Sequence, residues 1–322
     1  MRHPLLSTLV ALLISGGVLY WLLQGASLDL ILNAVERLPL WRVALALVLL
    51  GVVQWLRGWR FALLVSGSLR PPSGVMVRVT LHLLLFNFVL PFKLGEASFP
   101  VLMRRAFGTD FGHAVGHLLM VRAFDVMTVL GLMLLAAGSL PAHLLPEPSG
   151  PVLLALGLLA LSTPVAMVVL LDHLRDMSPA SASLMQRLTD GAAKARSPRL
   201  LLALVGLSLL IWGTHMLIAW MVVAPIAPDL SFAAIAMANA AVHFAFALPV
   251  PAVAGLGAPQ AAWVAALTLT GASLATATTT ALLTHGVVLL GVLLLGLAGL
   301  LPWPGEGPTI GIRRPARAGN RK

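Results

Sequence analysis

Two side chains of opposite charge lie inside a long apolar stretch of the sequence. Arg122 and Asp125 are three residues apart in the apolar run 114–137, so a helix places them on one face. Ionisable groups inside a membrane-spanning helix are costly unless they are paired or solvated, and they mark a functional site by default. The two groups therefore form either a structural ion pair that fixes helix packing or part of a polar cavity for a charged ligand.

A second charged pair flanks a glycine between two short apolar stretches. Lys93 and Glu96 lie on either side of Gly95. A helix that begins near Glu96 presents free backbone amides and the positive end of its dipole, and Lys93 beside it completes a seat for a phosphate. The competing interpretation is that Glu96 is a simple helix cap. One turn earlier, Asn87 is expected to satisfy backbone groups that the break at Pro91 frees.

Further arginines lie at the ends of apolar stretches. Arg57 and Arg60 share a helix face beside two tryptophans, and Arg104 and Arg105 end the interrupted stretch that follows. At such positions arginine commonly extends its side chain to the headgroup layer, with tryptophan as an interface anchor. The alternative is that these arginines attract the phosphate of a lipid at the mouth of a cavity.

The composition requires a membrane around these residues. Of the 322 residues, 59% are hydrophobic and only 10% are charged, whereas a soluble domain carries about 25% charged residues. Apolar runs of roughly 17–25 residues recur, and each is long enough to cross the roughly 30 Å hydrocarbon core as a helix. Alternating segments of about ten residues, which a membrane barrel needs, are absent from the sequence. We therefore expect an all-α integral membrane protein.

Charge and residue usage exclude several classes of function. The net charge of +10 arises mostly from basic residues at the ends of apolar runs, where they contact anionic headgroups, so nucleic-acid binding is not expected. The sequence has no cysteine, which excludes disulfides, cysteine-based zinc sites and thiol catalysis. It also has no recognised catalytic or nucleotide-binding motif, so we expect neither an enzyme nor a bound cofactor or metal.

Six apolar runs predict spanning helices, and two further stretches are interrupted by proline and glycine. The spans cover residues 5–23, 41–63, 114–137, 152–171, 200–224 and 276–300. The first is long for the apolar part of a signal peptide and has no cleavage motif after it, so we interpret it as a retained helix. The interrupted stretches, 75–106 and 232–270, have halves too short for full crossings.

The placement of lysine and arginine predicts the orientation. Segments 138–150 and 200–312 contain no basic residue, which places the first outside and both termini in the cytoplasm of a bacterial inner (cytoplasmic) membrane. The first interrupted stretch must then enter and leave on the inner side, and the second on the outer side, as re-entrant helical hairpins. The resulting domain covers residues 1–302, and residues 303–322 form a basic cytoplasmic tail.

The two halves, about 1–140 and 150–302, are predicted to be inverted repeats. F-N-F-V-L-P at 86–91 matches F-A-F-A-L-P at 244–249, and Leu-Gly follows each break. Inverted repeats with broken helices are typical of alternating-access transporters, whose sites lie near the breaks. The repeat offset pairs Asp125 with His285 and sets Gln260 at a place similar to that of Glu96, so we include His285 and Gln260 among the candidate site residues.

Three segments resemble a known family. W-L-R-G-W-R-F-A-L-L at 55–64, N-F-V-L-P-F-K-L-G-E at 87–96 and V-R-A-F-D at 121–125 are similar to motifs of the flippase-like family named after the transmembrane region of lysylphosphatidylglycerol synthases. The later P-A-V-A-G-L-G-A-P-Q at 251–260 resembles the glycine-rich segment of that family. The chain departs from the family pattern with Lys93 for an arginine, Ala254 for a glycine and Gln260 for a glutamate.

The resemblance implies that the chain moves lipid or lipid-linked substrates between leaflets. The expected substrates are anionic or polyprenyl-linked lipids, with the residues named above along a polar cavity. An alternative is a non-transporting membrane subunit that scaffolds an enzyme of cell-envelope lipid synthesis, such as hopanoid synthesis; a third is an intramembrane lipid-modifying enzyme. Only a short basic tail follows residue 302, so lysine transfer to lipid is not expected.

Overall fold

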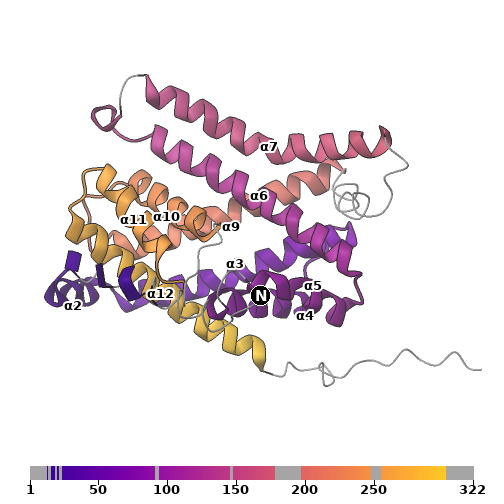
Figure 1. Ribbon diagram of the computed structural model, residues 1–322, viewed down its shortest axis with the longest axis horizontal. Coiled ribbons are helices and arrows are strands. Elements are labelled where there is room, and N and C mark those ends of the chain that lie inside the picture. The colour runs from indigo at the N-terminus through magenta and orange to yellow at the C-terminus, as the bar shows by residue number, and fades with distance from the viewer. Residues whose placement is uncertain are drawn as a thin grey trace, which may run out of the picture.

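The described part of the chain is all-helical, as the sequence predicts. The computed structural model describes residues 24–90, 94–145, 148–177, 197–247 and 255–301, together with residues 13, 16–18 and 20–21. Its elements (Figure 1) are α2 (Leu28–Arg37), α3 (Leu40–Ser66), α4 (Gly74–Val89), α5 (Leu94–Phe107), α6 (Phe111–Gly138), the 3₁₀ helix η2 (Ala142–Leu144), α7 (Ser149–Met177), α9 (Pro198–Val223), α10 (Phe232–Ala247), α11 (Ala258–Leu269) and α12 (Leu274–Leu300).

Five of these helices are long and apolar enough to cross a membrane. They are α3, α6, α7 over Ser149–Leu170, α9 and α12. Each coincides with one of the predicted spans, because an uninterrupted apolar run of this length has no other stable conformation in lipid. The first predicted span, 5–23, lies largely outside the described residues, and the tail 303–322 lies entirely outside them.

Each of the two interrupted stretches forms a pair of short helices. α4 packs against α5, and α10 packs against α11. The close approach within the first pair requires glycine, since a Cβ on Gly95 would collide with backbone atoms of Phe86 and Asn87. In the second pair Gly255 adopts a positive φ of 70°, which favours glycine. Re-entry of these pairs into the membrane, and the inverted repeat, stay predictions.

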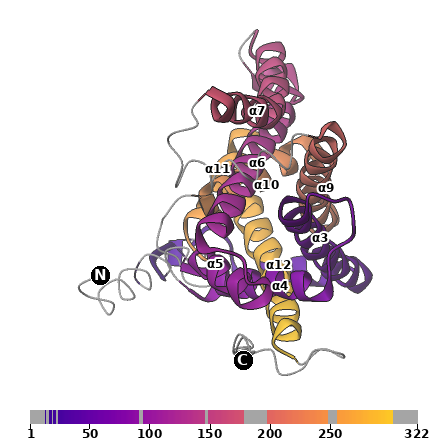
Figure 2. The ribbon, with the colours of Figure 1, turned by 90° about the vertical axis from the view of Figure 1, so that its right-hand side faces the viewer.

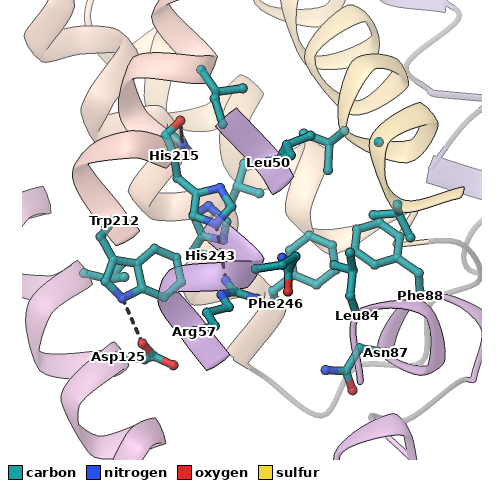
Figure 3. A pocket seen from close by; sticks show the side chains of 18 of the residues that line it. Leu50, Arg57, Leu84, Asn87, Phe88, Asp125, Trp212, His215, His243 and Phe246 are labelled. Atoms are coloured by element: carbon teal, nitrogen blue, oxygen red, sulfur yellow. Dashed lines mark hydrogen bonds between the residues drawn. The ribbon is translucent and has the colours of Figure 1, made fainter. Parts of the chain in front are cut away.

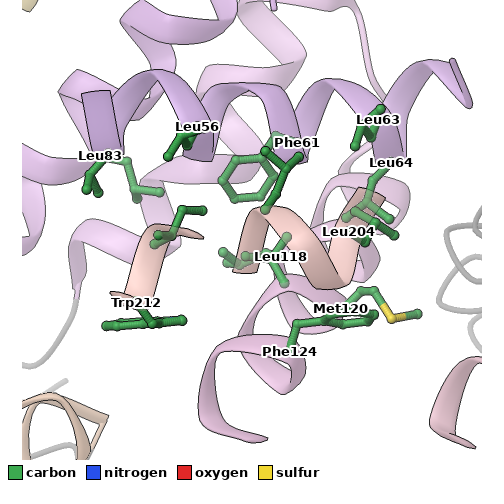
Figure 4. Packing of buried hydrophobic residues seen from close by; sticks show 14 of the residues in the cluster. Leu56, Phe61, Leu63, Leu64, Leu83, Leu118, Met120, Phe124, Leu204 and Trp212 are labelled. Atoms are coloured by element: carbon green, nitrogen blue, oxygen red, sulfur yellow. The ribbon is translucent and has the colours of Figure 1, made fainter. Parts of the chain in front are cut away.

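The largest part of the core joins helices that are distant in the sequence. Phe61 of α3, Phe124 of α6 and Leu204 of α9 are buried in one hydrophobic cluster, to which α4 also contributes (Figure 4). A second cluster joins α9 to α10, α11 and α12 around Trp263. Helix α9 belongs to both clusters, so it connects the two halves of the protein.

Helices α6 and α7 cross at the edge of the molecule through small residues (Figures 1 and 2). A Cβ on Gly131 would lie 2.5 Å from Leu161 Cγ and 2.9 Å from the carbonyl oxygen of Gly157. A Cβ on Gly138 would lie 2.9 Å from the carbonyl oxygen of Gly150. Glycine at both crossings lets the two backbones touch, which is how helices associate without a hydrophobic driving force in lipid.

We expect Gly131→Ala to destabilise the protein by about 1–3 kcal/mol, because backbone and a branched side chain must both move to admit the methyl group. Gly213→Ala in α9 is the matched control, since its Cβ would meet nothing within 4 Å. Thermal unfolding of the detergent-solubilised proteins measures both effects. Equal melting temperatures for the two variants would contradict a close α6–α7 contact.

The predicted orientation is testable with one cysteine in the loop before α7 and another just before α9. The chain has no native cysteine, so His143→Cys and Ser197→Cys each create a unique thiol at an exposed position. An impermeant thiol reagent added to spheroplasts should label His143→Cys, because its loop is predicted to be outside, and should label Ser197→Cys only after the membrane is opened. The reverse pattern would invert the orientation that the basic residues predict.

Candidate functional site

A cavity of about 230 Å³ lies between the helices of the two halves (Figure 3). Its walls come from α3, α4, α5, α6, α9, α10, α11 and α12. Eight of the residues selected from the sequence line it: Arg57, Arg60, Asn87, Glu96, Arg122, Asp125, Gln260 and His285. Lys93 lies outside the described residues. Arg104 and Arg105 are exposed in the last turn of α5 and are not among the residues that line the cavity.

The carboxylate of Asp125 is the centre of a buried ion-pair network. Its Oδ1 lies 2.7 Å from Arg60 Nη1 and accepts a hydrogen bond from Trp212 Nε1 at 2.9 Å, while its Oδ2 lies 3.1 Å from Arg122 Nη1. The Asp125 side chain is only 7% exposed. Each carboxylate oxygen therefore has a cationic donor, which offsets the cost of removing the charge from water.

Arg60 is the deepest cation of this network. Its side chain is 2% exposed, and its Nη1 also donates a hydrogen bond to Ser208 Oγ of α9 at 3.0 Å. The interpretation that Arg60 extends to the headgroup layer is therefore wrong, because the guanidinium points into the protein toward Asp125. The residue that most directly neutralises Asp125 is Arg60, 65 positions earlier in the chain, and not only its helical neighbour Arg122.

Glu96 joins the network from the first turn of α5. Its Oε1 lies 3.0 Å from Arg122 Nη2, so Arg122 bridges two carboxylates, Glu96 and Asp125. Glu96 is therefore more than a helix cap. Asn87 at the end of α4 lines the same cavity, and its Oδ1 accepts no hydrogen bond from the described residues. Its expected role of satisfying freed backbone groups is thus not observed within the part of the chain that the structure describes.

Arg57 lies one turn from Arg60 and has a different environment. Its Nη2 lies 3.3 Å from His215 Nε2, and its guanidinium is 5.7 Å from the centre of the Trp212 ring. The rings of Trp212, His215 and His243 form a cluster with centroids 4.7–5.4 Å apart (Figure 3). Within the described residues Arg57 makes no ion pair, so three arginines face two carboxylates in the cavity and one positive charge is in excess.

The second half contributes a neutral counterpart. Gln260, in the first turn of α11, has its Nε2 2.9 Å from His285 Nδ1 of α12. Its Oε1 accepts a hydrogen bond from the backbone N–H of Gly257 at 2.7 Å and so caps the N-terminus of α11. The start of the second short helix thus contacts the following long helix in each half, through Glu96 and Arg122 in one and Gln260 and His285 in the other.

The two helix pairs meet at the centre of the cavity. Phe88 at the end of α4 and Phe246 at the end of α10 have ring centroids 5.7 Å apart (Figure 3). These residues hold the same place in the two matching motifs, F-N-F-V-L-P and F-A-F-A-L-P. Equivalent positions of the two proposed repeats are therefore in direct contact.

Many residues that line the cavity were not selected from the sequence. Among them are Gln54, Trp212, His215, Asn239 and His243, whose side chains all carry hydrogen-bonding groups. A signal for His215 was present, because an ionisable residue in the apolar run 200–224 marks a functional site as much as Arg122 does. The other four carried no distinctive spacing. In the described part of the chain, no group of three or more histidine and acidic side chains is placed to hold a metal ion.

The network predicts unequal effects of removing its two carboxylates. Asp125→Asn leaves Arg60 buried without a counterion and should lower the free energy of unfolding by about 3–5 kcal/mol. Glu96→Gln should cost less, because Arg122 keeps Asp125 and both side chains are partly exposed. Arg60→Met together with Asp125→Asn should recover much of the lost stability. Denaturant unfolding of the four proteins measures this, and a mild effect of Asp125→Asn alone would contradict the network.

One comparison with known proteins identifies the family of the chain. The family described as the lysylphosphatidylglycerol synthase TM region matches residues 8–296, nearly the whole sequence. No curated protein and no solved structure matches the chain. The matched range includes every described residue that lines the cavity. The chain is therefore an integral membrane protein that belongs to the family of the lysylphosphatidylglycerol synthase transmembrane region, which is tied to lipid biology.

Proposed function

We propose that this protein moves an anionic lipid, or a polyprenyl-linked lipid with an anionic headgroup, between the leaflets of a bacterial inner membrane. The observation that carries the proposal is a cavity among apolar helices in which the described residues place three arginines against two carboxylates. Arg57 is only partly exposed and has no counterion among the described residues, and a cation in that position is costly in a low-dielectric environment. An anionic headgroup removes that cost, so it binds where a neutral one does not.

The construction of the cavity favours transport over static binding. Both interrupted stretches contribute to its walls, through Asn87 and Glu96 from the first and Asn239 and Gln260 from the second. Binding sites between two broken-helix elements of inverted repeats are the arrangement that alternating-access carriers use. Contact between Phe88 and Phe246, which hold equivalent places in the two motifs, supports such a repeat.

The proposed movement requires the orientation that the basic residues predict. With both termini in the cytoplasm, α4 with α5 enters from the inner side and α10 with α11 from the outer side. The cavity then lies where the two pairs meet, and a shift of either pair opens it to one leaflet. A lipid headgroup crosses by passing through the cavity while its chains stay in the hydrocarbon region.

The competing role is a non-transporting subunit that scaffolds an enzyme of lipid synthesis. A scaffold needs no polar centre, and a dry apolar interior between its helices would be more stable than buried charges. The network around Asp125, and Arg57 with no carboxylate partner among the described residues, are therefore features that favour the carrier.

Reconstitution into liposomes tests the proposal. Protein in vesicles that carry a fluorescent anionic lipid should make the inner-leaflet label accessible to a membrane-impermeant quencher, and a neutral labelled lipid should respond far less. Arg57→Gln should abolish most of the activity and leave the protein folded, because Arg57 makes no ion pair with the described residues and the change removes only its contacts with His215 and the Trp212 ring. Arg37→Gln at the exposed end of α2 is the control. Equal rates for Arg57→Gln and the wild type would remove Arg57 from the path.

A further inference from the structure

A buried glutamine in the cavity has no role in the network around Asp125. Gln54 of α3 is 2% exposed and lines the cavity, yet its Oε1 has no hydrogen-bond partner among the described residues. Its backbone carbonyl is already engaged, because it accepts a hydrogen bond from the Thr80 hydroxyl at 3.1 Å. An unsatisfied buried amide is costly, and the great majority of such groups in proteins have a partner. No described residue therefore holds the Oε1 atom of Gln54 in a hydrogen bond that a ligand would have to displace.

The position of Gln54 on the helix limits which part of a ligand it can reach. Gln54 precedes Arg57 by three residues, so the two side chains are neighbours on one face of α3, with Cβ atoms about 5–6 Å apart. Both line the same cavity. A phosphate held by Arg57 thus places the next atoms of its headgroup beside Gln54. Leu50 lies one turn from Gln54 on α3, also lines the cavity, and is apolar, so the polar side chains on this face of α3 are those of Gln54 and the residues after it.

The chemistry of the carboxamide selects the group that fits there. A carboxamide accepts a hydrogen bond through its oxygen and donates one through its nitrogen. A hydroxyl can donate to that oxygen or accept from that nitrogen. An ammonium group only donates, and it would cancel the negative charge that the phosphate brings to Arg57, so a zwitterionic headgroup leaves the excess positive charge of the described residues uncompensated. An alkyl group would leave the amide unsatisfied. A hydroxyl is therefore the favoured partner of Gln54.

The size of the cavity is consistent with a headgroup alone. Pockets for whole drug-sized ligands measure about 300–1,000 Å³, and this cavity measures about 230 Å³. A phosphodiester with a small hydroxylated substituent fits such a volume, while acyl or prenyl chains must stay outside.

We infer that Gln54 is a specificity-determining residue that selects phosphodiester lipids with a hydroxyl close to the phosphate, and discriminates against headgroups that end in an alkyl or ammonium group. The inference rests on the proposed function, since it assumes that an anionic headgroup enters the cavity at Arg57. It adds a second point of recognition, and it concerns the choice among headgroups rather than the movement itself.

Binding to the detergent-solubilised full chain tests the inference with lipids of matched charge. Short-chain phosphatidylglycerol and phosphatidylpropanol carry the same phosphodiester and differ in the hydroxyls of the headgroup. The wild type should bind phosphatidylglycerol about tenfold more tightly, since a buried polar group is otherwise left unsatisfied. Phosphatidylethanolamine should bind more weakly than both. A second arm compares a polyprenyl-phosphate hexose with an alkyl polyprenyl phosphate, and the pair with the larger ratio identifies the natural source of the headgroup.

The variant Gln54→Met keeps the length of the side chain and removes its amide. It should bind phosphatidylpropanol with wild-type affinity, which shows an intact cavity, while its preference for the hydroxylated lipid falls to about one. Leu50→Met, on the same wall, should keep the full preference. Equal binding of both phosphodiesters by the wild type, a preference that survives in Gln54→Met, or loss of affinity for both lipids in Gln54→Met would overturn the role of Gln54 and leave the proposed function standing. Failure of the wild type to bind any phosphodiester lipid would overturn both.

Discussion

The structure depends on one carboxylate, that of Asp125, which receives donors from three helices. Arg60 comes from α3, Arg122 from the same helix as Asp125, and Trp212 from α9. Helices in lipid gain little from hydrophobic contact with one another, so a buried charge that must keep its partners is a strong constraint on how they pack. The hydrophobic cluster that contains Phe61, Phe124 and Leu204 packs the same three helices, α3, α6 and α9, against one another. Within the described residues the network pairs both carboxylates with Arg60 and Arg122 and leaves Arg57, which lines the same cavity, without one.

In both halves the start of the second short helix contacts the following long helix, but the residues that make the contact differ in chemistry. In the first half a glutamate at the start of α5 pairs with an arginine of α6, and in the second half a glutamine at the start of α11 contacts a histidine of α12. A carboxamide can be satisfied by hydrogen bonds alone, so Gln260 needs no cation and even closes the start of its own helix through Gly257. The charge of the cavity is consequently concentrated on one side. A headgroup bound as proposed would meet the arginines and carboxylates on one wall only.

The sequence predicted the parts of this fold that depend on local patterns. Long apolar runs fixed the spans within a few residues, and the spacing of Arg122 and Asp125 predicted their contact, because both follow from the geometry of a single helix. The pairing of Arg60 with Asp125 joins residues that no periodicity links, so it appears only once the helices are packed. The same holds for the ring cluster around His215, whose members come from two helices. Lys93 and the first predicted span lie largely or wholly beyond the described residues, and the re-entrant geometry stays a prediction.

The contact between Phe88 and Phe246 has a mechanical consequence. Under the proposed inverted repeat, two equivalent atoms that touch must lie close to the pseudo-twofold axis, because any displacement from that axis separates them by twice its amount. A rotation of one half against the other then leaves these two rings almost in place and moves remote groups by amounts that grow with their distance from the rings. The aromatic pair is thus suited to act as a fulcrum. In the proposed transport cycle it would keep the two halves in register while the headgroup is exposed first to one leaflet and then to the other.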